Sequence, residues 1–164
     1  YFTDPPYGLE KNMDDPAKEI DFQGVYVRRT DGSVELLTDE MTRPNGVAFS
    51  PDEQTLYVAN SDPQKAIWMA FDLDEQGMIA GSRVLFDATD QVGETNKGLP
   101  DGLKVRADGI IFATGPGGVW VFNPVEESHY PTFVTTKIQN VPTGIVDTLG
   151  IVIMYSMEQW YIEE

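Results

Sequence analysis

Hydrophobic and polar residues alternate along most of this chain in short runs that are separated by turn residues. The runs predict β-strands at residues 24–29, 34–37, 46–49, 55–59, 66–73, 83–86, 102–105, 110–114 and 118–122, and near 132–136. Asp-Gly pairs at 31–32 and 108–109 favour tight hairpin turns between neighbouring strands. Residues 14–20 are short and polar, so we expect a loop there. The pattern therefore predicts an all-β protein.

A proline, a polar residue and a glycine recur in that order where predicted strands begin. This three-residue motif, which we call the Pro-polar-Gly line, occurs as Pro44-Asn45-Gly46, as Pro100-Asp101-Gly102 and, more weakly, as Pro142-Thr143-Gly144. Repeats roughly 40 to 60 residues apart, in units of short strands, are typical of β-propeller blades. The repeated polar position would then fall at one end of one strand in each blade. We expect Asn45 and Asp101 to lie close together for this reason.

Counting strands outward from these lines gives a single domain with an incomplete set of blades. Residues 1–42 are expected to end one blade, 43–98 to form a complete blade and its loop, 99–136 to form another, and 137–164 to form a divergent partial blade. A closed ring of six four-stranded blades needs about 24 strands. We therefore expect an arc of about two full and two partial blades, part of a longer protein, whose open faces favour self-association.

An aromatic residue recurs in the third strand of each predicted blade. The residues are Tyr26, Trp68, Trp120 and, in the divergent tail, Trp160. The interpretation we favour is packing between neighbouring sheets, and the alternative is stacking on a ligand.

Composition narrows the possible partners. The 164 residues carry 27 acidic and 11 basic side chains, for a formal charge of −16, which argues against binding a nucleic-acid backbone. No apolar run approaches the length of a membrane span. Cysteine is absent, which excludes disulfides and thiolate ligands and leaves the compartment undetermined. The acidic charge fits an ordinary solvated surface or a cation site.

Asn45 and Asp101 are candidate metal ligands, because a hard cation such as calcium prefers oxygen donors and accepts carboxamide and carboxylate alike. A cation with open positions polarises a carbonyl group and activates water, so hydrolysis would need no serine nucleophile. The chain has no Gly-x-Ser-x-Gly motif, and its single histidine, His129, is expected at the surface. The alternative is that Asn45 and Asp101 are ordinary turn residues.

Other polar residues have weaker claims to a functional role. The long connection at residues 87–97 leads directly to Asp101, so Glu94, Asn96 and Lys97 are expected to form a lip that faces a substrate. Asn60 and Asp62 follow a predicted strand and are expected to form a loop rather than to bind a ligand.

Several motifs together resemble a known family. They are residues 1–8, Arg43-Pro44-Asn45-Gly46 with Ser50-Pro51-Asp52, Tyr57-Val58-Ala59-Asn60-Ser61-Asp62, Leu99-Pro100-Asp101-Gly102 and Gly115-Pro116-Gly117-Gly118-Val119-Trp120. Their order and spacing over residues 1–124 resemble the gluconolactonase branch of the senescence marker protein (regucalcin) and gluconolactonase family.

The resemblance implies a six-bladed β-propeller that hydrolyses lactones such as glucono-1,5-lactone. It also implies one divalent cation, usually calcium, with zinc, magnesium or manganese as alternatives. Asn45 and Asp101 match metal ligands of the family, and Asp101 is thereby the candidate catalytic residue.

The chain also departs from the family's pattern. A further ligand, a Glu, and a channel Asn are expected before Tyr1, and the tail diverges from about residue 125, with Thr143 at a ligand position. The tail fits a degenerate blade, a genuine variation, or a fused or misread sequence. The alternative function is a non-catalytic calcium-binding or interaction propeller, or an inactive truncated fragment, since one fold supports many roles.

Overall fold

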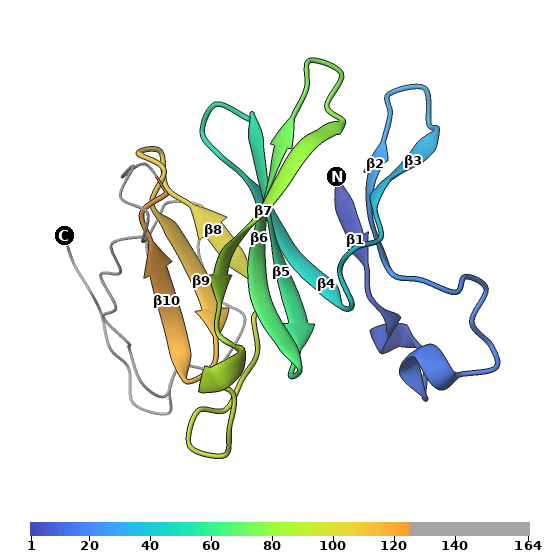
Figure 1. The fold of residues 1–164 in the computed structure, drawn as a ribbon. Coiled ribbons are helices and arrows are strands. Elements are labelled where there is room, and N and C mark those ends of the chain that lie inside the picture. Colours follow the sequence, from blue (N-terminus) through green and yellow to red (C-terminus); the bar gives the residue numbers. More distant parts are fainter. Residues whose placement is uncertain (125–164) are drawn as a thin grey trace, which may run out of the picture.

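A computed structural model describes residues 1–124, which form strands with almost no helix (Figure 1). The strands are β1 (Phe2–Asp4), β2 (Gly24–Arg28), β3 (Val34–Thr38), β4 (Pro44–Phe49), β5 (Thr55–Asp62), β6 (Lys65–Leu73), β7 (Ile79–Asp87), β8 (Leu103–Val105), β9 (Ile111–Gly115) and β10 (Gly118–Phe122). The 3-10 turns are η1 (Pro6–Gly8), η2 (Asn12–Asp14) and η3 (Thr89–Gln91). No helix in this part of the chain has the length and hydrophobicity to cross a membrane.

The strands form separate antiparallel sheets in chain order. The first sheet has the order β1-β2-β3, the second β4-β5-β6-β7, and the third β8-β9-β10. The first strand of each sheet in chain order, here called its leading strand, is β1, β4 or β8. These leading strands are neighbours, because β1 contacts β4 and β4 contacts β8 (Figure 1). The predicted fold class, all-β sheets of the propeller type, is confirmed. The number of blades and their boundaries stay predictions.

Strands occur at every predicted position between residues 24 and 122, and two of them are longer than their sequence pattern indicates by three or more residues. β5 continues through Asn60 to Asp62, and β7 begins at Ile79. Both extensions pair with β6, a nine-residue strand whose backbone N–H and C=O groups need hydrogen-bond partners along both edges. The strand predicted near 132–136, the partial blade at 137–164 and His129 lie outside the described residues.

The hairpin predicted at Asp31-Gly32 connects β2 and β3. Gly32 has a φ of 92°, in the left-handed region that glycine adopts without steric cost. The Asp31 carboxylate accepts a hydrogen bond of 2.9 Å from the Ser33 amide, which fixes the turn.

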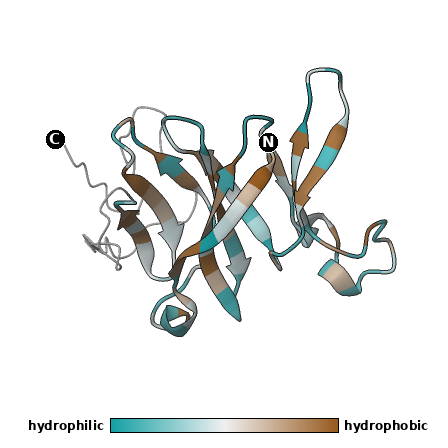
Figure 2. Cartoon of the chain, turned by 45° about the horizontal axis from the view of Figure 1, so that its top comes forward, coloured by the Kyte–Doolittle hydropathy of each residue, from teal (hydrophilic) through white to brown (hydrophobic). Residues whose placement is uncertain are grey.

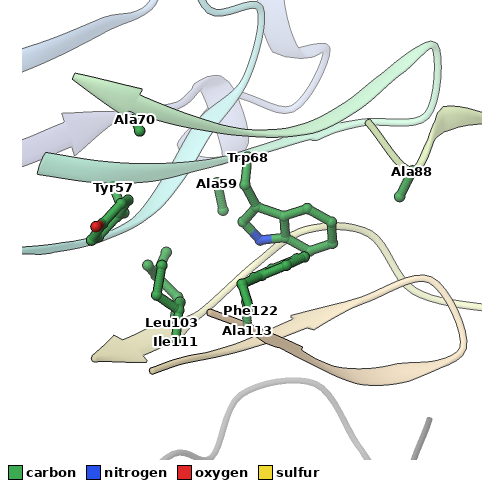
Figure 3. Packing of buried hydrophobic residues seen from close by; sticks show 9 residues of the cluster. All are labelled: Tyr57, Ala59, Trp68, Ala70, Ala88, Leu103, Ile111, Ala113 and Phe122. Carbon is green, nitrogen blue, oxygen red and sulfur yellow. The ribbon is translucent and has the colours of Figure 1, made fainter. Parts of the chain in front are cut away.

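The core lies between the sheets, where hydrophobic residues concentrate on the strands and polar residues on the turns (Figure 2). One cluster joins the second and third sheets and contains Tyr57, Ala59, Trp68, Ala70, Ala88, Leu103, Ile111, Ala113 and Phe122 (Figure 3). The other joins the first and second sheets and contains Val25, Met41, Leu56, Val58, Ile67, Met69 and Phe71. The second sheet thus packs against a neighbouring sheet on each of its faces.

Two of the recurring aromatic residues pack between sheets as predicted. The ring centroids of Trp68 and Trp120 are 5.9 Å apart. Figure 3 shows that Trp68 also packs against Phe122, with ring centroids 5.1 Å apart. Tyr26 instead stacks on Phe2 at 5.3 Å, on the face of the first sheet opposite the buried Val25. Trp160 is outside the described residues.

Candidate functional site

The two Pro-polar-Gly lines meet in space. The amide of Gly46 donates a hydrogen bond of 3.0 Å to the backbone carbonyl of Asp101. Pro44 and Pro100 are fully buried, whereas the polar residues that follow them, Asn45 and Asp101, are only half-buried. The buried prolines anchor each line; Asn45 lies on β4, and Asp101 lies in the segment directly before β8. Whether they bind a metal remains a prediction.

Glycine is required at position 46 by this close approach. A Cβ atom at Gly46 would lie 2.1 Å from the carbonyl oxygen of Asp101 and 2.9 Å from the Cα of Gly102. At the matching position of the second line, a Cβ atom on Gly102 would meet nothing within 4 Å. The two glycines of the repeat therefore have different roles, and only Gly46 permits the contact between sheets.

Asn45 is held by partners from two different sheets. The Thr3 hydroxyl, on β1, donates a hydrogen bond of 2.6 Å to the backbone carbonyl of Asn45. The side-chain Nδ2 of Asn45 donates to the Ser61 hydroxyl oxygen at 3.0 Å. The carboxamide thus uses its nitrogen for structure, and its Oδ1 is the atom that can bind a cation.

Ser61 is the residue of this site that the sequence analysis missed. Its side chain is 5% exposed, and its hydroxyl donates a hydrogen bond to the carbonyl of Pro100. Its own amide donates to the Arg43 carbonyl at 2.9 Å, and its carbonyl accepts a bond of 3.3 Å from the Tyr7 hydroxyl. The sequence feature that could have indicated Ser61 is the polar pair Asn60-Ser61, which directly follows the apolar run of β5.

Asp101 is fixed through its backbone and not through its carboxylate. Its amide donates to the carbonyl of Thr114 on β9 at 3.1 Å, and the Thr114 amide donates to the Gly102 carbonyl at 2.9 Å. Within residues 1–124, the Asp101 carboxylate makes no hydrogen bond or ion pair. A rigid backbone therefore carries a carboxylate that has capacity for a ligand.

Asn60 and Asp62 lie in β5 and not in a loop, which corrects the expectation from the sequence. Asn60 is fully buried; its Oδ1 accepts from the Arg43 amide at 2.7 Å and its Nδ2 donates to the Lys65 carbonyl at 2.7 Å. Burial alone would raise the pKa of Asp62, but the hydrogen bond from the Gln64 amide and further polar neighbours outweigh it and lower that pKa. Both side chains support the strand end.

The predicted lip begins after η3 and is fastened near its end to the third sheet. The Asn96 amide donates to the Gly93 carbonyl at 3.0 Å, and the Lys97 carbonyl accepts a bond of 2.8 Å from Gly117, in the turn between β9 and β10. Glu94 and Lys97 are exposed and Asn96 is half-buried. In Figure 1 this connection extends from the same end of the sheets as the β5–β6 turn. Its role toward a substrate remains a prediction.

The donor chemistry of the junction fits a hard cation. Asn45 offers a carboxamide oxygen and Asp101 a carboxylate, the ligand types that calcium prefers. Calcium takes about six to eight oxygen ligands, so these two would be part of a larger set that includes water. No cluster of three or more His, Cys, Asp or Glu side chains suited to a metal occurs among residues 1–124. The two lines are therefore a candidate site on the chemistry of their oxygen donors, and the remaining ligands stay undefined by the described residues.

Comparison with known families agrees with the fold and with these motifs. The model of the SMP-30/gluconolactonase/LRE-like region matches residues 1–141. The chain therefore belongs to this family, as its motifs predicted.

The individual relatives include gluconolactonases and a regucalcin. The chain is 38% identical over 125 residues to a gluconolactonase of Zymomonas mobilis, covering 76% of this chain and 35% of that protein. A gluconolactonase structure from Xanthomonas campestris is 37% identical with a TM-score of 0.59, covering 74% of this chain and 39% of the other. A calcium-binding protein, regucalcin, from Agrobacterium tumefaciens is 28% identical with a TM-score of 0.50, covering 62% and 33%. The chain thus spans between a third and two fifths of the length of these relatives.

Proposed function

We propose that this chain contributes to a metal-dependent lactonase that hydrolyses sugar lactones such as glucono-1,5-lactone. The observation that carries the proposal is the hydrogen bond between Gly46 and Asp101, which brings the two predicted ligands to one junction. Gluconolactonases among its relatives support the substrate class. Calcium is the cation we favour, in view of the oxygen donors and the calcium-binding relative, with zinc, magnesium or manganese as alternatives.

The two ligands would have distinct roles. Asn45 would present its Oδ1, because its Nδ2 is committed to Ser61. Asp101 would supply negative charge from a carboxylate that no described residue neutralises, and it is therefore the candidate catalytic residue. When bound, the cation would polarise the lactone carbonyl and lower the pKa of a water molecule.

The substrate would be oriented by residues around this junction. Glu94 and Lys97 are exposed on the connection that leads into the Asp101 line, so their side chains are available to the hydroxyl groups of a sugar lactone. Asn96 is held in a local turn and would shape that connection. We propose this lip as the part of the described chain that contacts the substrate.

The experiment measures hydrolysis of glucono-1,5-lactone by proton release in the full-length protein, before and after removal of metal with EDTA. We expect activity to fall on chelation and to return with calcium. Asp101→Ala should lose nearly all activity while keeping its circular dichroism spectrum, because the lost group binds the cation and is not part of the core. Asp108→Ala is the matched control, since it removes an exposed aspartate from the turn between β8 and β9.

The alternative function gives a different result. A protein that binds calcium through Asn45 and Asp101 without hydrolysing any sugar lactone would be a non-catalytic calcium-binding propeller, and the calcium-binding protein regucalcin among the relatives is the reason to test for it. Wild-type turnover of Asp101→Ala at saturating calcium would contradict the assignment of Asp101.

A further inference from the structure

We propose that Ser61 is a positioning residue that fixes which atom of the Asn45 carboxamide faces the cation. The proposal rests on the proposed function, because it presumes that Asn45 and Asp101 bind a cation. It concerns a residue on β5, whose side chain is almost fully buried and is itself no candidate ligand.

The Ser61 hydroxyl has a single proton to donate. That proton is donated to the carbonyl of Pro100, which is only an acceptor. The Ser61 oxygen therefore has only lone pairs left for its other neighbour. That neighbour is the Asn45 side chain, at 3.0 Å.

The orientation of Asn45 follows from this direction of donation. A carboxamide has a nitrogen that donates and an oxygen that accepts, and the two are nearly equal in size. If Asn45 turned its Oδ1 toward Ser61, two acceptor oxygens would face each other without a proton between them. With Nδ2 toward Ser61, the bond is made and Oδ1 points to the other side. Ser61 thus selects the orientation that presents an oxygen ligand.

The same hydroxyl also links the two halves of the site. Pro100 immediately precedes Asp101, and its fully buried ring leaves the carbonyl as its polar contact with β5. One side chain therefore bonds to Asn45 in the first line and to the residue before Asp101 in the second. Ser61 couples the orientation of one ligand to the backbone position of the other.

The experiment is a double-mutant cycle in the full-length protein, with calcium affinity measured by isothermal titration calorimetry. Ser61→Ala should weaken calcium binding by about tenfold, the lower end of the effect of removing a group that orients a metal ligand. The same change in an Asn45→Asp background should weaken it by less than about threefold, because either carboxylate oxygen can bind calcium and no orientation remains to be selected.

Ser50→Ala is the matched control. Ser50 is also a nearly buried serine, in the turn between β4 and β5, whose hydroxyl donates one bond, to Asp52, and accepts one, from the Thr55 amide. Neither of these hydrogen bonds joins Ser50 to a Pro-polar-Gly line. The calcium affinity of the Ser50→Ala variant should therefore stay within about twofold of the wild type. Ser61→Thr keeps the hydroxyl and should retain most of the affinity that Ser61→Ala loses.

The outcomes separate this proposal from the function on which it rests. If Ser61→Ala weakens calcium binding equally in the wild-type and the Asn45→Asp backgrounds, Ser61 only supports the fold and the proposal is overturned. An unchanged calcium affinity of Ser61→Ala would overturn it as well. Unchanged calcium affinity in both Asn45→Ala and Asp101→Ala would instead overturn the metal site itself. If Ser61→Ala does not fold, Ser61→Cys replaces it in the cycle, because a thiol is a weak acceptor for the Asn45 amide.

Discussion

The backbone amide of Gly46 lies 3.0 Å from the backbone carbonyl of Asp101, to which it donates a hydrogen bond. This bond connects the leading strand of the second sheet to the segment that opens the third. Asp101 is itself the acceptor of this bond, and Asn45 directly precedes its donor. Their separation is therefore set by backbone atoms and does not depend on flexible side chains.

A methyl group at Gly46 should disrupt this junction. Gly46→Ala would place Cβ 2.1 Å from the Asp101 carbonyl oxygen, so the strands must separate. We expect the free energy of unfolding to fall by about 1–3 kcal/mol, the usual cost of overpacking. Gly102→Ala, with nothing within 4 Å of its Cβ, should differ from the wild type by less than about 0.5 kcal/mol. Urea denaturation measures both, and equal losses would contradict the specific role of Gly46.

Removing the Asn60 side chain should destabilise the end of β5. Asn60→Ala leaves the Arg43 amide and the Lys65 carbonyl without the partner that each now has. Since a buried group that loses its partner costs about 1–3 kcal/mol, we expect a loss of about 2–4 kcal/mol in the free energy of unfolding. Gln64→Ala, an exposed change in the adjacent turn, should cost less than about 0.5 kcal/mol. A loss below 1 kcal/mol for Asn60→Ala would refute this account.

The aromatic cluster between the second and third sheets should depend on Trp68. Trp68→Ala is expected to cost about 3–5 kcal/mol of unfolding free energy, because it opens a cavity beside Trp120 and Phe122. Trp68→Phe should cost only about 1–2 kcal/mol, since the indole Nε1 is buried without a hydrogen-bond partner in the described structure and its removal is favourable. Thermal denaturation of both variants tests the ranking, and a reversed order would contradict it.

Acid should remove a stabilising contribution at the turn between β8 and β9. Hydrogen bonds from the Arg106 guanidinium to both carboxylate oxygens lower the pKa of Asp108 from 3.8 to about 2. Because the folded-state pKa lies below the ordinary value, this contribution is fully present above about pH 4 and is lost as the pH falls toward 2. An NMR titration of the Asp108 carboxyl should therefore have its midpoint near pH 2.

Arg106→Gln provides the control for that titration. Without the guanidinium, the Asp108 midpoint should move up toward 3.8, and the acid-induced loss of stability should become smaller. An unchanged midpoint would show that Arg106 is not the cause of the lowered pKa.

The sequence by itself determined the strands, the turns and the family. Strand alternation and Asp-Gly turn chemistry act between residues that are close in the chain, so the hairpin at Asp31-Gly32 and the β10 range were predictable from local patterns. The repeat of Pro-polar-Gly lines likewise indicated that Asn45 and Asp101 occupy equivalent positions.

Only the tertiary structure decided how those positions meet. The contact of Gly46 with Asp101, the burial of Asn60 and the two bonds of Ser61 all join segments that are distant in sequence. Such contacts depend on how twisted sheets pack against each other, and the period of two along a strand carries no information on that packing. For this reason the candidate ligands were visible in the sequence, whereas the serine that orients one of them was not.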